Sequence, residues 1–346
     1  MKTLKDFDFK DKRVLVRCDF NVPLDERGDI LDDFRIKQTI LTIQYLIKKG
    51  AKIILMSHLG KPKGKLIEIL KLDKVKEKLI KYLNLPVIKM NDCIGKEIEK
   101  RTKEMKLGQV LLLENLRFHK EEEEGDLNFA KELAKLGDIF INEAFSACHR
   151  PHASIVGVPK YLPSGMGFLL EKEIKNLKKI IEKPTLPLVA IFGGKEGDFK
   201  AINKISEVTS SVLIGYLIKK QIEEEKIVLQ HPEKIISPVD GIEENSNLDI
   251  GPKTLEIFNR EILKAKTIFW SGPIGKVEED KYQKGTKEIA NSIIKSGAFS
   301  VVGGGETVEF LNEAGIIDKF SHVSTGGNAM FSFLAGEELP GIKVLK

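Results

Sequence analysis

Short apolar runs alternate with amphipathic stretches along the first half of the chain. Five such runs stand at residues 13–17, 51–57, 86–90, 109–114 and 138–142. They are apolar and rich in branched residues, as expected for strands buried on both faces. After the first run, isoleucines from Ile36 to Ile47 recur at helical spacing and Gly50 follows as a stop. A helical pattern at 126–137 ends in the same way, at Gly137. Strands alternating with helices predict a parallel sheet that is covered by helices on both faces.

The second half repeats this pattern. Its apolar runs stand at 187–193, 211–214, 267–270, 299–302 and 322–325, and its helical patterns lie near 200–209, 252–264, 282–295 and 306–314. Between the halves, residues 167–183 carry an apolar stripe at helical spacing, and Pro184 follows. We therefore expect an α/β protein with two Rossmann-like, doubly wound parallel-sheet domains joined by a helix. The predicted ranges are 1–166 for the N-terminal domain, 167–183 for the helix, 184–330 for the C-terminal domain and 331–346 for a C-terminal segment.

Composition narrows the choice of partners. The net charge of +5 is mild, and Lys and Glu are intermixed along the chain of 346 residues. We find neither the basic stripe nor the interleaved aromatic residues typical of nucleic acid binding, so we expect no nucleic acid partner. Three widely spaced cysteines indicate a reducing compartment. The start is polar and no apolar run approaches the roughly 18 residues that span a membrane. These features predict a cytoplasmic protein with no membrane partner, and we expect a monomer.

Basic and polar residues follow four predicted strands of the first half. The segments are CDFNVPL (18–24), SHLGKPKG (57–64), ENLRFHKEEEE (114–124) and NEAFSACHRPH (142–152). Ligands of open parallel sheets bind outside the carboxyl ends of the strands. Five basic residues should therefore converge there, namely Arg35, His58, Lys61, Arg117 and Arg150. So many cations repel one another unless an anion lies between them, which predicts a small, multiply anionic ligand. The acidic run 121–124 is expected to be solvated.

Glycine-containing segments follow four strands of the second half, and three of them carry two or three adjacent glycines. The segments are FGGKEGDFK (192–200), WSGPIGKVEED (270–280), VVGGGETVEF (301–310) and STGGNAM (324–330). Glycine allows backbone N–H groups to approach a phosphate, and a helix N-terminus favours its charge. A single glycine pair would only indicate a tight turn, but three in one domain favour nucleotide binding. Neither G-x-x-x-x-G-K-[ST] nor G-x-G-x-x-G is present, which argues against P-loop enzymes and dinucleotide dehydrogenases.

The order of these motifs resembles the phosphoglycerate kinase family over nearly the whole chain. The segments that carry the resemblance are DFNVPL, DDFRI, SHLGKPKG, LLLENLRFHKEEE, ACHRPHAS, DIGPKT, W-x-G-P-x-G, GGGET and FSHVSTGG. It implies two domains that face a cleft, with the C-terminal segment packing back toward the N-terminal domain. It also implies reversible phosphoryl transfer between 1,3-bisphosphoglycerate and ADP, giving 3-phosphoglycerate and ATP in glycolysis or gluconeogenesis. Mg²⁺ is expected with the nucleotide.

The resemblance assigns roles to particular residues. It implies that 3-phosphoglycerate is bound by Asp19, Phe20, Asn21, Arg35, His58, Leu59, Gly60, Lys61, Arg117 and Arg150. The catalytic residues it implies are Arg35 and Lys200, and we add Lys195 for a reason given below. Nucleotide binding is assigned to Lys200, Glu278, Gly304, Gly305, Glu306 and Thr307. Glu306 is also the expected Mg²⁺ ligand, with the metal held mainly by the nucleotide phosphates.

Departures from the family pattern cluster in the nucleotide half. Glu196 stands where the family has a second lysine and Glu306 where it has aspartate, while Ser271 and Asn247 also replace usual residues. We hypothesise that Lys195, next to Glu196, supplies the missing charge. In the first half only Lys61 departs from the family pattern. It replaces an arginine and keeps the charge, but it lacks the paired N–H donors that bind two oxygens at once.

Two alternatives therefore stay open. One is a related enzyme with a different nucleotide or carboxylate substrate, and the other is a non-catalytic protein that binds a phosphorylated metabolite. Glu196 and Glu306 discriminate between the hypotheses, because acidic groups disfavour a polyphosphate unless a metal lies between them.

Overall fold

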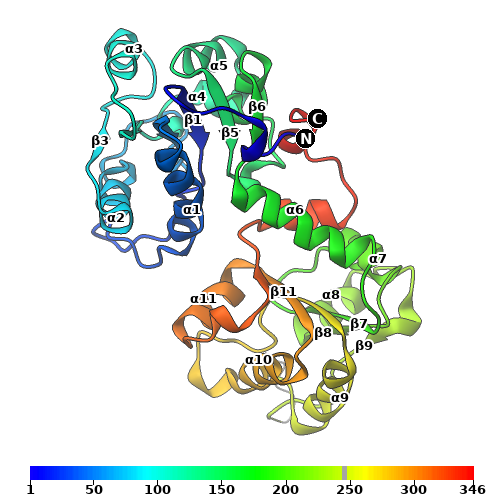
Figure 1. The fold of residues 1–346 in the computed structure, drawn as a ribbon. Coiled ribbons are helices and arrows are strands. Elements are labelled where there is room, and N and C mark those ends of the chain that lie inside the picture. Colours follow the sequence, from blue (N-terminus) through cyan, green and yellow to red (C-terminus); the bar gives the residue numbers. More distant parts are fainter. Residues whose placement is uncertain (244–247) are drawn as a thin grey trace. The chain divides into compact units, whose positions relative to one another are not determined.

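The computed structural model describes residues 1–243 and 248–346 (Figure 1). Its contacts divide the chain into an N-terminal unit, Met1–Glu173 with Glu338–Lys346, and a C-terminal unit, Ile174–Glu337. The first division falls inside helix α6 (Phe168–Ile181), within the stretch predicted to link the domains. The last residues of the chain therefore share a compact unit with its beginning. The domain ranges given above stay predictions.

The N-terminal unit is built on a sheet of six parallel strands in the order β3-β4-β2-β1-β5-β6. The strands are β1 (Arg13–Arg17), β2 (Lys52–Met56), β3 (Val87–Lys89), β4 (Val110–Leu112), β5 (Ile139–Asn142) and β6 (Ser164–Met166). The first five confirm the predicted strands. The edge strand β6 was not predicted, because its sequence SGM has none of the branched residues that mark a strand.

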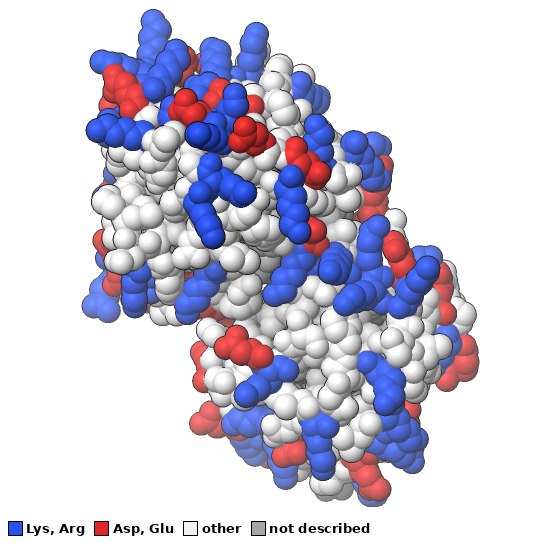
Figure 2. Space-filling model, in the orientation of Figure 1, with Lys and Arg blue, Asp and Glu red and all other residues white. Residues whose placement is uncertain are grey.

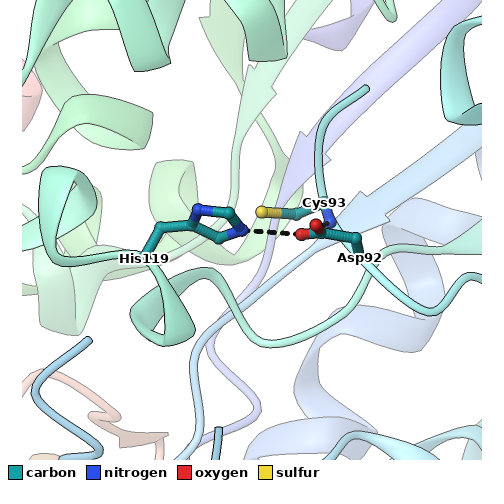
Figure 3. Close-up of side chains that lie close together, drawn as sticks. All are labelled: Asp92, Cys93 and His119. Atoms are coloured by element: carbon teal, nitrogen blue, oxygen red, sulfur yellow. Dashed lines mark hydrogen bonds and ion pairs between the residues drawn. The ribbon is translucent and has the colours of Figure 1, made fainter. Parts of the chain in front are cut away.

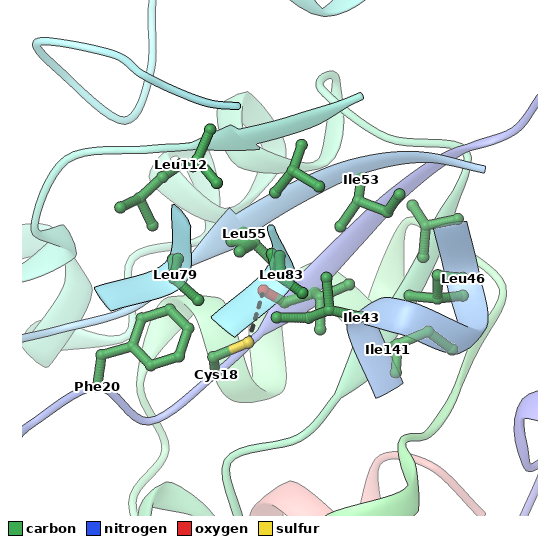
Figure 4. Close-up of a cluster of buried hydrophobic side chains, with 14 of the residues drawn as sticks. Cys18, Phe20, Ile43, Leu46, Ile53, Leu55, Leu79, Leu83, Leu112 and Ile141 are labelled. Carbon is green, nitrogen blue, oxygen red and sulfur yellow. Dashed lines mark hydrogen bonds between the residues drawn. The ribbon is translucent and has the colours of Figure 1, made fainter. Parts of the chain in front are cut away.

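Helices cover this sheet. They are α1 (Phe34–Lys48), α2 (Asp73–Leu83), α3 (Lys96–Lys103), α4 (Lys120–Glu124), α5 (Leu127–Ala134) and α13 (Pro340–Lys343). Shorter helical segments are η1 (Leu4–Asp6), η2 (Glu68–Leu70), η3 (Leu116–Phe118), η4 (Phe145–Ala147), η5 (Ala153–Gly157) and η6 (Val158–Lys160). Ile53 and Ile54 point to opposite faces of the sheet and are both fully buried, so both faces are covered. Figure 4 shows one face, where Ile43 of α1 and Leu79 of α2 lie in the same apolar cluster as Leu55.

The C-terminal unit has a second sheet of six parallel strands, in the order β12-β11-β10-β7-β8-β9. The strands are β7 (Leu188–Phe192), β8 (Ser211–Ile214), β9 (Ile235–Ile236), β10 (Thr267–Ser271), β11 (Phe299–Gly303) and β12 (His322–Val323). Its helices are α7 (Phe199–Ser206), α8 (Tyr216–Glu224), α9 (Pro252–Lys264), α10 (Lys284–Ser296), α11 (Gly305–Glu313) and α12 (Asn328–Leu334), with short turns η7 (Pro232–Lys234), η8 (Asp280–Tyr282) and η9 (Ile317–Lys319). The sequence analysis missed β9, which is only two residues long, and α8.

Strand register places the loops that matter side by side. Arg17, the last residue of β1, pairs with Met56 of β2 and with Asn142 of β5. Ser271, the last residue of β10, pairs with Phe192 of β7 and with Gly303 of β11. Because all strands in each sheet are parallel, the loops that follow them leave from one edge. The predicted doubly wound architecture is confirmed for each sheet.

Candidate functional site

Asp19, in the loop after β1, is buried and surrounded by donors. Arg35 Nη1, from the first turn of α1, lies 2.7 Å from Asp19 Oδ2. The Ser146 hydroxyl also donates to this oxygen, and the Asn21 N–H donates to Oδ1 at 3.0 Å. Burial by itself would raise the pKa of Asp19, but the charge of Arg35 and these hydrogen bonds outweigh it and hold the pKa well below its usual range. The carboxylate is therefore fixed in its charged form.

Hydrogen bonds connect the loops that follow β1, β2 and β4. Asn21 Oδ1 accepts from the Gly60 N–H at 2.8 Å, and Ser57 Oγ accepts from the Phe20 N–H at 2.8 Å. Arg117 Nη1 donates to the Gly60 carbonyl at 2.8 Å. Three segments that are distant in the sequence are therefore held as one edge, as the strand-end argument predicts.

His58 is not the cation that the sequence analysis expected. Its Nδ1 lies 3.2 Å from Nη2 of Arg17, which has no acceptor, so Nδ1 accepts and the proton sits on Nε2. Burial lowers the pKa of His58 well below its usual range. The charge of Asp19 opposes this shift, and the charges of Arg17 and Arg117 add to it. The ring is neutral here, and it offers a hydrogen bond instead of a charge.

Arg117 and Arg150 differ in their surroundings. The Arg117 side chain is buried, and its Nε lies 3.2 Å from Glu123 Oε1. Arg150 is partly buried and its Nε donates to His149 Nε2 at 3.0 Å. Burial lowers the pKa of Arg117, and the charges of Arg17 and Arg150 add to this effect, so the three guanidinium groups act on one another. Lys61 is exposed beside Gly60.

A buried ionic network behind these loops was missed. Arg17 is fully buried and donates from Nε to Ser154 Oγ at 2.8 Å. Ser154 Oγ donates in turn to Glu122 Oε1 at 2.6 Å, and Arg17 lies 3.7 Å from the same oxygen. Glu122 is fully buried, so the expectation that the acidic run is solvated is wrong at this position. The available signal was an arginine at the end of an otherwise apolar strand, since a buried charge needs a partner.

A cavity of about 240 Å³ lies at the strand ends of the C-terminal unit, next to the start of α8. Lys195, Tyr216, Leu217, Ile274, Glu278 and Glu306 are among the residues that line it. Lys195 Nζ lies 2.9 Å from Glu278 Oε1 and 3.2 Å from Glu306 Oε1. Hydrogen bonds to Glu278 and Glu306 raise the pKa of Lys195. The structure thus brings together Lys195, which was predicted to be catalytic, and two residues predicted to bind the nucleotide, Glu278 and Glu306.

Lys200 has a different partner. It lies in the first turn of α7, and its Nζ is 2.9 Å from Glu337 Oε1. Its ion pair is therefore separate from the one that joins Lys195 to Glu278 and Glu306. Glu196 is exposed, and Asn247 lies outside the described residues.

The loop between β11 and α11 requires its glycine. Gly304 has φ of +90°, and a Cβ there would lie 2.9 Å from Ser271 Oγ. Thr307 Oγ1 accepts from the Gly272 N–H at 2.9 Å, so this loop and the one after β10 are tied together. Gly304 is the N-cap of α11, whose first N–H groups have no partner within the helix. Such a helix start suits an anionic group.

Charges on the surface are mixed. On the face drawn in Figure 2, Lys and Arg side chains are interspersed with Asp and Glu. In the part of the chain that the structure describes, no helix combines the length and the apolar character needed to cross a membrane.

Two parallel α/β sheets, one with buried arginines at its strand ends and the other with a glycine-rich helix start beside a cavity, define a two-domain phosphotransferase. A family model described as phosphoglycerate kinase matches residues 4–222 and 216–337. The chain belongs to the phosphoglycerate kinase family. Its activity is that of a phosphoglycerate kinase, a glycolytic transferase that acts on a carboxyl group and uses a nucleotide.

Relatives match over their full length. The phosphoglycerate kinase of Dictyoglomus turgidum is 43% identical over 99% of this chain and 98% of its own, and that of Borrelia garinii subsp. bavariensis is 42% identical over 100% and 99%. The solved phosphoglycerate kinase of Pyrococcus horikoshii has a TM-score of 0.89 at 31% identity, covering 100% of this chain and 98% of that one. The enzyme from Coxiella burnetii has a TM-score of 0.83 at 31% identity, covering 99% and 98%.

The relatives are longer than this chain. The first alignment has 388 positions, against 346 residues here. The two pieces of the family match overlap at residues 216–222, at the start of α8. Tyr216 and Leu217, which line the cavity, lie in this overlap.

Proposed function

We propose that the enzyme transfers a phosphoryl group between 1,3-bisphosphoglycerate and MgADP, with the glycerate substrate on the N-terminal unit and the nucleotide on the C-terminal unit. The observation that carries this proposal is the strand edge at which Arg35 meets Asp19 and Arg117 meets Gly60. These guanidinium groups are held by the protein before any ligand arrives. Phosphoryl transfer depends mainly on such positioning and on stabilisation of charge.

In the N-terminal unit, the proposed roles divide between the two ends of the substrate. Asp19 and Asn21 would bind the hydroxyl and carboxyl end, and Arg35 would contact the transferring phosphoryl group. The neutral His58 would donate a hydrogen bond to the non-reacting phosphate, while Arg117 and Arg150 would supply its counter-charges. A buried arginine supports this arrangement, because a guanidinium matches two phosphate oxygens at once. Phe20, Leu59 and Gly60 would contribute backbone contacts, and Lys61 a charge at the exposed rim.

In the C-terminal unit, the proposed nucleotide site is the cavity beside α8. Glu278 would bind the ribose, and residues 304–307 would receive the phosphates at the start of α11. Lys195, in the loop after β7, and Lys200, in the first turn of α7, would both act on the phosphates. The apolar walls from Tyr216, Leu217 and Ile274 suit a base, and they support this orientation.

The carboxylate set fits Mg²⁺ held mainly by a nucleotide. Proteins bind this cation through one or two carboxylates together with substrate phosphates, and Glu306 is a half-exposed carboxylate in the first turn of α11. When bound, Mg²⁺ would neutralise phosphate charge beside Glu306 and Glu278. We also propose a cytoplasmic monomer, and the three buried free thiols support a reducing location.

Hydrogen exchange with each substrate alone tests the assignment to the two units. 3-Phosphoglycerate should slow amide exchange in residues 18–24, 57–61 and 114–118. MgADP should slow exchange in residues 193–200 and 303–308. Protection of 303–308 by 3-phosphoglycerate, or of 57–61 by MgADP, would refute the proposed assignment.

A further inference from the structure

Three potential metal ligands converge away from the substrate loops. Asp92 and Cys93 follow β3, and His119 follows β4 and the short helix η3. These two strands are neighbours in the sheet, with Lys89 paired to Leu112, so their following segments leave the same edge. Figure 3 shows the carboxylate, the thiol and the imidazole pointing toward one another. Among the described residues, this is the group whose ligand atoms come close enough to hold an ion.

The separations suit a small tetrahedral site after a modest adjustment. The three ligand atoms lie within 4.8 Å of one another, and His119 Nε2 is 2.6 Å from Asp92 Oδ1. Metal–ligand bonds of about 2.0–2.3 Å in a tetrahedron set ligand atoms about 3.3–3.8 Å apart. A pair at the upper limit would have to close by roughly 1–1.5 Å, and the His119–Asp92 pair would have to open by about 1 Å. The side chains of Asp92 and His119 are 51% and 27% exposed, which leaves both free to rotate by this amount.

The backbone around the cluster is fixed. The Glu114 N–H donates to the Asp92 carbonyl at 3.3 Å, and the Cys93 N–H donates to Asp92 Oδ1 at 2.6 Å. The His119 ring lies against Phe129, with centroids 5.2 Å apart. The backbone positions of the ligands are therefore set, and metal binding would require only rotation of the partly exposed side chains. An ion pair alone would explain why Asp92 and His119 lie side by side, but it would not explain why the buried Cys93 thiol lies beside them.

We propose that Asp92, Cys93 and His119 bind one thiophilic divalent cation, of which Zn²⁺ is the best match, with a fourth position open to water. A thiolate, an imidazole nitrogen and a carboxylate oxygen are all ligands that Zn²⁺ takes, and three protein ligands leave one position open. Binding forms the sulfur–metal bond and releases the thiol proton to solvent, and a protonated His119 loses its ring proton as well.

The cation would act on the substrate loops through the chain. His119 is two residues beyond Arg117 and is the residue that precedes α4. A metal at this point would tie the loop after the edge strand β3 to the segment that carries Arg117. Its role would therefore be to hold that segment, separately from the Mg²⁺ that accompanies the nucleotide.

Cobalt titration of the metal-free, full-length protein tests the proposal. Co²⁺ should bind with one equivalent and give a near-ultraviolet charge-transfer band from a thiolate, which Zn²⁺ should abolish by displacement. Cys93→Ser should remove the band. Cys148→Ser is the matched control, because Cys148 is equally buried and its thiol contacts the Ala144 carbonyl. His119→Gln and Asp92→Asn should each weaken Co²⁺ binding by more than about tenfold, since even outer-shell partners are worth 10–100-fold.

Circular dichroism of each variant separates loss of ligand from loss of fold. If Cys93→Ser does not fold, the two variants at the partly exposed His119 and Asp92 decide the question. The proposal is overturned if the wild-type protein gives no thiolate band with Co²⁺. It is equally overturned if the band survives Cys93→Ser, disappears with Cys148→Ser, or is unchanged in both His119→Gln and Asp92→Asn.

Discussion

Arg35 Nη1 donates a hydrogen bond to Asp19 Oδ2 at 2.7 Å, and the same nitrogen lies 3.2 Å from the Asn21 carbonyl oxygen. The arginine is therefore held over the loop after β1 although about a third of its side chain is exposed. Only part of its guanidinium is used in these contacts. The remaining N–H donors are available to oxygens that carry charge during phosphoryl transfer.

Replacing Arg35 should affect turnover more than binding. We expect Arg35→Ala to lower kcat by about 10²-fold or more, the scale of losing one preorganised donor to the transition state. The KM for 3-phosphoglycerate should change much less. Arg35→Lys is the control, since lysine keeps the charge but lacks the paired N–H donors of the guanidinium. Its kcat should lie between that of the wild type and that of Arg35→Ala. Steady-state kinetics with a normal kcat and a raised KM would instead place Arg35 in ground-state binding.

Arg117 and Arg150 should act on binding, because their proposed phosphate does not react. Each change to Ala should cost about 1.5–3 kcal/mol of 3-phosphoglycerate binding, the range for hydrogen bonds to charged groups. MgADP binding should be unaffected. Calorimetry with each ligand alone measures both values. An equal loss of affinity for 3-phosphoglycerate and MgADP would contradict the assignment of these arginines to 3-phosphoglycerate.

The two lysines of the nucleotide loop should differ. Lys195 is joined to Glu278 and Glu306 by exposed ion pairs, which are weak and can be exchanged for a phosphate. Lys195→Ala should lower kcat by about tenfold or more, as for a lost charge donor, with little change in MgADP affinity. Lys200→Ala should impair both. Glu196→Lys is the companion variant, and it should be tolerated or raise the rate. Unchanged turnover in Lys195→Ala would end the idea that this residue compensates for Glu196.

Glu143 gives the fold a specific pH dependence. It is fully buried, and it accepts hydrogen bonds from the Thr42 hydroxyl and from the Leu169 and Leu170 N–H groups at the start of α6. Burial raises its pKa to about 7 from 4.5, although these hydrogen bonds oppose the shift. The folded state therefore binds a proton more tightly than the unfolded state.

The consequence is a loss of stability as pH rises. Glu143 should contribute fully below about pH 4.5, and its contribution should fall as pH rises through about 7. The loss should total about 3 kcal/mol, from 1.36 kcal/mol per pKa unit. In urea unfolding at pH 5 and pH 8, Glu143→Gln should gain stability relative to the wild type at the higher pH. The exposed Glu182→Gln should not. Parallel pH profiles for Glu143→Gln and the wild type would show that Glu143 does not titrate in this range.

Sequence patterns predicted the sheets well because buried parallel strands have a strong local signature. RVLVR and SVLI became β1 and β8, and the stripe at 167–183 became α6. The strand β6 has no branched residues, and β9 is only two residues long, so neither forms a recognisable run. Each is formed by pairing with a neighbour, Met166 with Asn142 and Ile236 with Leu213, and pairing is set by the tertiary structure.

The candidate site was predictable in position but not in charge. Strand-end logic placed Asp19, His58 and Arg117 together because parallel strands end at one edge. It could not predict that His58 is buried, which makes its ring neutral. Nor could it predict that Arg17 pairs with Glu122, which lies in an acidic run that was expected to be solvated. Both depend on which side chains the fold encloses, and sequence spacing does not contain that information.

The central claim is that the substitutions in the nucleotide half leave phosphoryl transfer from MgATP to 3-phosphoglycerate intact. A coupled assay of nucleoside diphosphate formation tests it most directly, with the Arg35→Ala variant as the slower control and MgGTP as the alternative nucleotide. The account predicts ADP formation that requires both 3-phosphoglycerate and Mg²⁺, and that falls about 10²-fold in the variant. The account would be contradicted if 3-phosphoglycerate did not accelerate ADP formation, or if the enzyme turned over MgGTP but not MgATP.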